Sequence, residues 1–344
     1  MVDDRSTPVL RSLLLGVLLA FVLPVAAATA ADTRVSAFYY PWYGTTSADG
    51  TFQHWGQRDH APPNDIASNF YPARGLYSSS DLLVISAQMD EIRAAGIGEI
   101  SVSWWGRGSA EDARLGAVAA AARADGIAVA VHVEPYPGRT VASIVDDLAY
   151  LRSYGVTTFY IYRALDLPIA DWAAAKRSLH PGGVTLYAQT ALVGAAAAAG
   201  FDGIYTYDIV TYPGSSLARL CGEAHNAHLL CAPSVGPGYD ARRGSGDPRV
   251  KPRRKGQTYD SMWRAAITAK ADRVTITSFN EWHEGTQIEP ASPTRWHGRF
   301  RYLSYDGAWG LHGVAAETAY LDRTRYWSDV FRSTFPLQLK TRAS

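Results

Sequence analysis

Eight short runs rich in β-branched and aromatic residues recur along this chain, and Ala-rich stretches of helical character separate most of them. The predicted strands are residues 34–39, 99–103, 128–133, 157–162, 184–188, 203–206, 229–233 and 274–277. The predicted helices include residues 81–95, 111–123, 141–154, 170–178 and 259–270. Alternating strands and helices are typical of parallel βαβ units, and eight such units close into a barrel. The sequence therefore predicts an α/β fold, a single-domain (β/α)8 TIM barrel whose long βα loops form an open cleft.

A doubly wound open sheet is the alternative architecture. It would place a glycine-rich phosphate-binding turn after the first strand. Residues 39–44 instead read YYPWYG, so bulky rings stand where a phosphate would need access to the backbone. This difference favours the barrel.

The N-terminus has the pattern of a secretory signal peptide. Arg5 and Arg11 precede an apolar run at residues 13–22, and the small residues 28–30, ATA, follow it. We therefore divide the chain into a signal peptide at residues 1–30 and a barrel domain at residues 31–344. The apolar run is short for a membrane span, although an uncleaved anchor remains the alternative. We expect a secreted or exported protein (periplasmic, extracellular or in a secretory lumen) that does not contact the membrane after cleavage.

Charge and composition narrow the class of ligand. A net charge of +1 gives no electrostatic footprint for nucleic acid. The basic cluster at residues 249–255 is interpreted as a solvated loop, because Pro248, Pro252 and Gly256 bracket it. Ten Trp and twenty Tyr favour a sugar-binding cleft, although large cores also use such rings. We expect a monomer that acts on an oligosaccharide or polysaccharide.

Two cysteines, Cys221 and Cys231, lie on either side of a predicted helix-to-strand return near Asn226. In an exported protein such a pair can form a disulfide, but spacing alone does not establish the required geometry. The sequence therefore does not decide whether Cys221 and Cys231 form a disulfide. A tetrahedral zinc site would need more ligands than this segment supplies.

The densest group of chemical side chains lies at residues 275–289, TITSFNEWHEGTQIE. Glu281 and Glu284 stand three residues apart, next to an amide, an indole and an imidazole. Two such carboxylates on a helix would usually be a solvated charged face. Here a strand-like run precedes them and Gly285 follows, which favours an active-site loop suited to proton transfer on a ring-shaped ligand.

Aromatic or ionisable residues also follow nearly every other predicted strand, where barrel active sites lie. Each of these rings could instead cap the barrel core. Glu134 could form a structural ion pair with Arg139, surface packing is the alternative for His54, and His132 is interpreted as a core histidine. Taken together, the ring-rich rim favours a carbohydrate cleft.

Eight motifs together resemble glycoside hydrolase family 99, the endo-α-1,2-mannosidases and endo-α-1,2-mannanases. In chain order they are FYYPWYG (38–44), HW (54–55), PPNDIASNFYP (62–72), HVEPYPGR (132–139), FYIY (159–162), FDGIYTY (201–207), PSVGPGY (233–239) and SFNEWHEGTQIE (278–289). The resemblance covers residues 36–305.

This resemblance implies a retaining, endo-acting hydrolase on a (β/α)8 barrel, without metal or cofactor. The substrate's own 2-hydroxyl would act as the nucleophile and form a 1,2-anhydro sugar. Glu281 would take the proton from that hydroxyl, and Glu284 would serve as acid and then base. The resemblance also implies substrate-binding roles for a further set of residues. These are Tyr43, His54, Trp104, Glu134, Tyr205 and Asn280.

The loops after Trp104 and after residue 207 are short, which leaves the preferred glycan open between mannan and glucose-capped chains. A catalytically silent carbohydrate-binding barrel is the alternative function.

Overall fold

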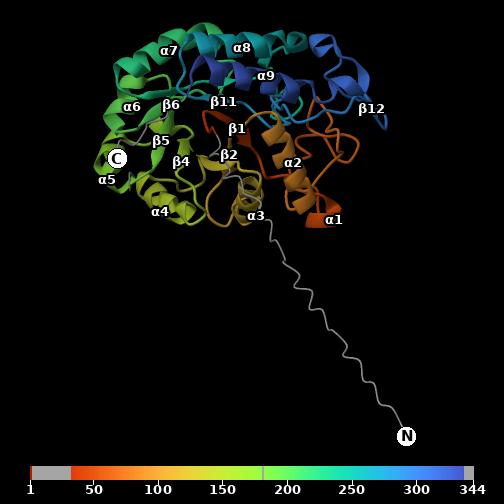
Figure 1. The fold of residues 1–344 in the computed structure, drawn as a ribbon, viewed down its shortest axis with the longest axis horizontal. Coiled ribbons are helices and arrows are strands. Elements are labelled where there is room, and N and C mark those ends of the chain that lie inside the picture. Colours follow the sequence, from red (N-terminus) through yellow and green to blue (C-terminus); the bar gives the residue numbers. More distant parts are fainter. Residues whose placement is uncertain (2–31, 180–181, 337–344) are drawn as a thin grey trace. The chain divides into compact units, whose positions relative to one another are not determined.

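The strands at the centre of Figure 1 form a nearly closed parallel barrel. The computed structural model describes Met1 and residues 32–179 and 182–336. The strand order in the main sheet is β7-β6-β5-β4-β3-β2-β1-β11-β8. These strands are β1 (Val35–Tyr39), β2 (Glu99–Trp104), β3 (Ala128–Val133), β4 (Thr158–Ile161), β5 (Thr185–Gln189), β6 (Gly203–Tyr205), β7 (Leu230–Ala232), β8 (Ser234–Val235) and β11 (Val274–Ile276). All eight predicted strands are present, and the (β/α)8 barrel is confirmed.

The barrel closes through one segment that changes partner at Pro233. β7 pairs with β6, and β8, which follows directly in the chain, pairs with β11. Pro233 lies between them and has no backbone N–H to donate to a ladder. Its carbonyl oxygen accepts from Thr275 N at 3.1 Å, so the segment has already turned towards β11 at this point. The predicted strand at residues 229–233 contains β7, and β8, which was not predicted, follows directly after it and supplies the other edge of the sheet.

Helices surround the strands in Figure 1. They are α1 (Thr46–Asp49), α2 (Leu82–Ala94), α3 (Ala110–Ala124), α4 (Val141–Arg152), α5 (Ile169–Leu179), α6 (Val193–Ala199), α7 (Gly214–Asn226), α8 (Gln257–Thr268) and α9 (Ala319–Thr334). Side-chain oxygens cap several of their N-termini. Asp81 accepts from Leu83 N before α2, Ser109 from Asp112 N before α3, and Thr140 forms a capping box before α4.

Aromatic rings fill the barrel interior. Phe38, Tyr160 and Tyr205 belong to one buried cluster, with ring centroids 5.1 to 5.8 Å apart. Beneath this cluster Arg273 pairs with Glu99. The many rings therefore serve partly as core, and the barrel is a packed interior rather than a pore.

Two short hairpins rise from the loops after the barrel strands. They are β9 (Tyr239–Asp240) with β10 (Val250–Lys251), and β12 (Trp296–His297) with β13 (Phe300–Arg301). The basic cluster at residues 249–255, expected to be solvated, is only partly so. Arg249 pairs with Asp208, and the Arg253 guanidinium packs against aromatic rings, because the hairpin folds back onto the barrel instead of projecting into water.

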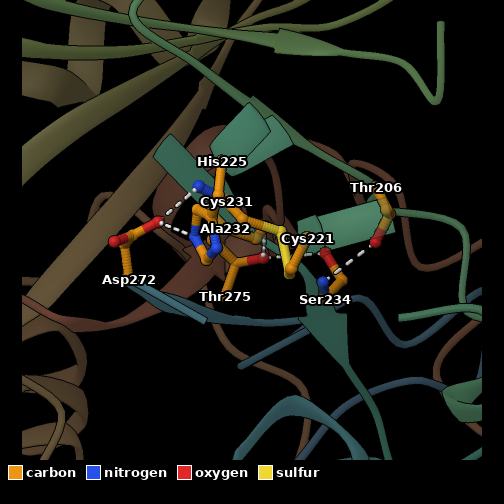
Figure 2. Close-up of a disulfide and its surroundings, with 8 residues drawn as sticks. All are labelled: Thr206, Cys221, His225, Cys231, Ala232, Ser234, Asp272 and Thr275. Atoms are coloured by element: carbon orange, nitrogen blue, oxygen red, sulfur yellow. Dashed lines mark hydrogen bonds and ion pairs between the residues drawn. A yellow bond between two sulfur atoms is a disulfide. The ribbon is translucent and has the colours of Figure 1, made fainter. Parts of the chain in front are cut away.

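The structure contains the disulfide that the sequence left open, between Cys221 on α7 and Cys231 on β7 (Figure 2). Asp272 lies beside the disulfide. Its Oδ2 accepts from the backbone N–H of Cys231 at 2.8 Å and lies 2.9 Å from His225 Nε2. The disulfide and this carboxylate both tie α7 to the barrel wall.

The predicted signal peptide, residues 1–30, lies outside the described residues apart from Met1. Among the helices that the structure does describe, none has the length and apolar character needed to cross a bilayer.

Candidate active site

The two candidate catalytic carboxyl groups lie on the loop that follows β11. Ser278 closes the base of this loop: its N–H donates to the Thr286 carbonyl oxygen at 2.9 Å, and its hydroxyl accepts from Glu281 N at 2.8 Å. Gly285 has a φ of +63°, and a Cβ there would come within 3.2 Å of the Asp240 carbonyl oxygen. The sequence thus folds into a tight turn that fixes where both carboxyl groups point.

Burial perturbs both carboxyl groups. Glu281 is 3% exposed, and its Oε1 accepts from His283 N at 3.0 Å. Burial first, and then the charge of Glu284, raise the pKa of Glu281 well above its ordinary value. Burial also raises the pKa of Glu284, to about 7. Two carboxyl groups that interact in this way retain a proton near neutral pH, as acid/base catalysis requires.

Tyr207 contacts Glu284 directly. Its hydroxyl donates to Glu284 Oε2 at 3.2 Å and lies 2.5 Å from the Tyr40 hydroxyl. The Tyr207 backbone has a φ of 51°, and it is held there by the hydroxyls of Ser234 and Thr277, which bond to its N–H and carbonyl oxygen. A left-handed backbone is uncommon for a residue other than glycine. This conformation turns the ring towards the carboxyl group.

Tyr205, from the same motif, was predicted to bind substrate, whereas Tyr207 was not. The Tyr205 ring lies inside the barrel, where its hydroxyl hydrogen-bonds to His132 Nε2 at 2.8 Å. Both tyrosines are at the end of β6, so the motif already indicated that Tyr207 could lie at the site. The choice between them depends on the left-handed backbone, which the motif does not reveal.

Glu284 also lines a small cavity of about 60 Å³ at the carboxyl ends of the strands. Tyr162, Tyr207, Asp208 and Arg249 are among the other lining residues. Arg249 Nη1 lies 2.9 Å from Asp208 Oδ2, so this ion pair forms part of the wall beside the carboxyl group. The loop after β6 and the β9–β10 hairpin therefore meet above Glu284.

Glu134 is the third carboxyl group of the site. Its Oε1 accepts from Ser103 Oγ at 2.8 Å and lies 3.0 Å from His132 Nδ1. The charge of Glu134 contributes to the raised pKa values of both Glu281 and Glu284, so the three groups converge. The alternative ion pair with Arg139 is not what the structure shows, since that guanidinium donates to the carbonyl oxygens of Val133 and Tyr162.

Tyr43 and Asn280 lie beneath the loop, and both are fully buried. The Tyr43 hydroxyl donates to the Asn280 carbonyl oxygen at 3.0 Å and accepts from Trp282 N at 3.1 Å. The Asn280 amide accepts from Tyr40 N and donates to Tyr40 O, at 2.7 and 3.1 Å. These two residues connect the end of β1 to the loop after β11.

Trp104, at the end of β2, is also fully buried. Its Nε1 donates to Asp112 Oδ1 at 2.8 Å, and its ring packs edge-on against Tyr136. The Trp104 indole thus joins β2 to α3 below the rim.

His54 belongs to a stack of rings beside the carboxyl groups. Its ring lies parallel to Trp42 with centroids 4.5 Å apart, and His283 follows at 6.2 Å. Burial lowers the pKa of His54 to about 4 and that of His283 to about 3, so both rings are neutral near pH 7. Trp42 Nε1, His54 Nδ1 and His283 Nε2 are buried and have no hydrogen-bond partner within the part of the chain that the structure describes. The stack therefore contains polar atoms that make no hydrogen bond to the described residues. Of its three residues, only His54 was predicted to bind substrate.

Within the described ranges, no three His, Cys, Asp or Glu side chains are arranged to hold a metal ion.

The fold and the site together define a glycosidase. A barrel that presents interacting carboxyl groups at the carboxyl ends of its strands, among aromatic rings, has the acid/base pair that hydrolysis of a glycosidic bond uses.

Comparisons with known proteins identify the family. Residues 30–333 match glycosyl hydrolase family 99, and the chain belongs to that family. It is 32% identical to a glycoprotein endo-alpha-1,2-mannosidase-like protein of Danio rerio, over 86% of this chain and 78% of that protein. It is 31% identical to a glycoprotein endo-alpha-1,2-mannosidase of Mus musculus, over 90% of this chain and 78% of that protein. The solved GH99 endo-alpha-mannosidase from Bacteroides thetaiotaomicron superposes with a TM-score of 0.77 at 32% identity, covering 89% of this chain and 99% of that chain.

Proposed function

We propose that this protein is an endo-acting α-mannosidase that cleaves internal α-mannosidic linkages next to α-1,2-linked mannose. The observation that carries the proposal is the coupled pair Glu281 and Glu284 on the loop after β11, in a chain whose relatives bear endo-mannosidase names. The glycan would be a mannan or a mannose-rich chain capped by glucose or mannose.

Glu281 acts as the base in this proposal. It takes the proton from the 2-hydroxyl of the mannose residue on the glycone side of the cleaved bond, and O2 attacks C1 to form a 1,2-anhydro sugar. The backbone N–H groups of His283 and Glu284 donate to Glu281 and partly oppose the effect of burial on its pKa.

Glu284 protonates the departing glycosidic oxygen as its bond to C1 breaks. The ionised Glu284 then takes a proton from water, the water oxygen attacks C1 as the C1–O2 bond breaks, and O2 recovers its proton from Glu281. Two inversions at C1 give net retention. A pKa of about 7 allows Glu284 to act as acid and base in turn near neutral pH.

The ring stack beside the pair is suited to bind the sugar. Its rings, from Trp42, His54 and His283, would form a wall against which a sugar packs. We also propose that Glu134 contacts the substrate, whereas Tyr43 and Asn280 act on it through the loop they hold. Trp104 and Tyr205 would shape the cleft from below the rim.

We also propose that the protein is exported and monomeric. N-terminal sequencing of the secreted protein would test cleavage after residue 30, and light scattering would test the monomer. A membrane-bound precursor or a stable dimer would contradict these two expectations.

Product analysis tests the reaction. Purified protein is incubated with an α-1,2-branched α-mannan and, separately, with a glucose-capped mannose oligosaccharide. We expect release of a disaccharide or longer fragment with retained anomeric configuration, and the preferred glycan identifies the substrate. Binding without any product from either glycan would contradict hydrolysis and favour the carbohydrate-binding alternative.

Two variants test the roles of the carboxyl groups. Glu284→Gln and Glu281→Gln should each abolish cleavage of the glycan while binding persists, and Glu223→Gln, at an exposed position on α7, should retain activity. Mass spectrometry should detect no sugar covalently attached to the protein. A trapped adduct would refute participation of the 2-hydroxyl.

A further inference from the structure

Arg253, just after β10, carries a guanidinium group enclosed by three aromatic rings. Its Cζ lies 4.6 Å from the ring centroid of Phe70, 4.8 Å from that of Tyr305 and 4.6 Å from that of Tyr320. Arginine stacks on ring faces through its planar, delocalised charge, which a lysine ammonium does not reproduce. The rings therefore hold this guanidinium in one orientation.

The enclosed guanidinium donates to the loop that carries the two carboxyl groups. Arg253 Nη2 lies 3.0 Å from the carbonyl oxygen of Gly285 and 2.7 Å from that of Gln287. Gly285 directly follows Glu284 in the chain. Hydrogen bonds from a charged donor are stronger than those between neutral groups, so Arg253 fixes the backbone immediately after the proposed acid.

Within the described ranges, these two are the hydrogen bonds that the Arg253 guanidinium donates. Its Nε and Nη1 are buried and have no hydrogen-bond partner among the described residues. Satisfying all five donors of an arginine normally stabilises a buried charge. Here the hydrogen bonds go only to the loop, and the ring faces supply the remaining stabilisation.

Packing alone does not hold this side of the loop. A cavity of about 370 Å³ lies beside it, and both Gly285 and Arg253 line that cavity. Two further donors from outside the loop restrain the same stretch: Asp240 N donates to the Glu284 carbonyl oxygen at 2.8 Å, and the Tyr305 hydroxyl lies 2.8 Å from the Glu289 carbonyl oxygen and 3.1 Å from that of Gln287. Polar anchors from outside the loop therefore hold it together with its packing.

The approach of Arg253 also requires a glycine on the β9–β10 hairpin. A Cβ at Gly238 would lie 2.7 Å from Arg253 Cγ and 2.7 Å from the Lys251 carbonyl oxygen. The missing side chain lets the arginine stem pass close to the hairpin backbone on its way to the loop.

We infer that Arg253 is a positioning residue for Glu284. Its ring-enclosed guanidinium clamps the Gly285 and Gln287 carbonyl groups and so holds the Glu284 carboxyl group in a fixed position relative to Glu281. This inference rests on the proposed function. It assigns a role to a residue of the basic cluster that acts through the loop and does not touch the sugar.

The test compares Arg253→Met with a matched control, Arg323→Met. Arg323 also stacks against three rings, Trp309, Tyr326 and Trp327, but it pairs with Asp260 and makes no contact with the loop. Two substrates share the same α-1,2-linked mannose glycone: one carries a sugar leaving group and the other an activated aryl leaving group, which needs little protonation. We measure kcat and KM for both.

For Arg253→Met, kcat with the sugar leaving group should fall roughly 10- to 100-fold, as expected for a misplaced catalytic group. KM should change little, and the loss with the aryl substrate should be smaller. Arg323→Met should retain kcat. The inference is overturned if Arg253→Met retains kcat, loses it equally with both substrates, or loses no more than the control. If Arg253→Met does not fold, Arg253→Lys decides by the same criteria, with a smaller expected loss.

Hydrogen exchange provides a readout that does not depend on the substrate. Amide exchange in the peptide at residues 278–289 should accelerate in Arg253→Met and stay at the wild-type rate in Arg323→Met. Wild-type protein that hydrolyses neither substrate would refute the proposed function, whereas unchanged exchange in Arg253→Met would refute the clamp. The two failures are therefore distinguishable.

Discussion

The hydroxyl of Tyr207 should set the upper end of the pH range in which the enzyme works. It donates to Glu284 Oε2 at 3.2 Å, and this hydrogen bond lowers the pKa of a carboxyl group that burial raises to about 7. Because Tyr207 gives its one hydroxyl proton to Glu284, the Tyr40 hydroxyl, 2.5 Å away, is the donor to Tyr207. Tyr207→Phe removes both hydrogen bonds and leaves the ring in place.

The size of the effect follows from the hydrogen bond. Hydrogen bonds to charged groups contribute about 1.5–3 kcal/mol, and a 3.2 Å contact belongs at the lower end. About 1.4 kcal/mol corresponds to a tenfold change in a protonation equilibrium. Losing a donor to the ionised form raises the pKa of Glu284, so the acid stays protonated to higher pH. The basic limb of the profile should therefore move upward by about one pH unit.

The assay is the pH dependence of kcat/KM, which reports ionisations of the free enzyme. Tyr205→Phe is the matched control, because that hydroxyl bonds to His132 and not to a carboxyl group at the reaction centre. Its basic limb should coincide with that of the wild type, whatever its maximal rate. A basic limb that stays in place or moves to lower pH in Tyr207→Phe would refute the reasoning.

Three further predictions concern stability and cofactors. Burial first, and then the charge of Glu289, raise the pKa of Glu91 from 4.5 to about 7, so the folded state should lose stability as pH rises across that window. Denaturant titrations at several pH values should show that Glu91→Gln reduces this dependence of the free energy of unfolding on pH. An unchanged pH dependence would contradict the assignment to Glu91. Replacing Cys221 and Cys231 with serine should lower the free energy of unfolding by about 2–3 kcal/mol, measured with urea; equal stability would show that the disulfide is not formed in solution. Activity should survive prolonged incubation with a chelator, and loss that added metal restores would overturn the metal-free mechanism.

Local patterns were sufficient to predict the barrel. Every predicted strand is present because alternating strand and helix periodicities reflect burial within each element. The seventh strand was predicted to end at Pro233, and β8, which follows it and changes partner, was not predicted. β8 depends on its pairing with β11, which is distant in the sequence.

The candidate site was predictable as a set of motifs but not as a set of roles. Glu281 and Glu284 were found because both lie in one short loop. Tyr43 and Asn280 were predicted to bind substrate, and the hydrogen bonds by which they hold the loop join residues more than 230 positions apart. Motifs identify the neighbourhood of a residue, whereas its partners depend on the closure of the barrel.

The basic cluster shows the same limit. Its charges and flanking prolines indicated a solvated loop, but Arg253 stacks on rings that come from residues 70, 305 and 320. The sequence by itself determined the barrel, the paired carboxyl groups and the family, because each can be recognised from residues that lie close together along the chain. Only the tertiary structure decided which tyrosine reaches Glu284, which arginine clamps the loop and that Cys221 meets Cys231. Those outcomes depend on where distant segments meet and how their backbones turn, and no local pattern encodes that.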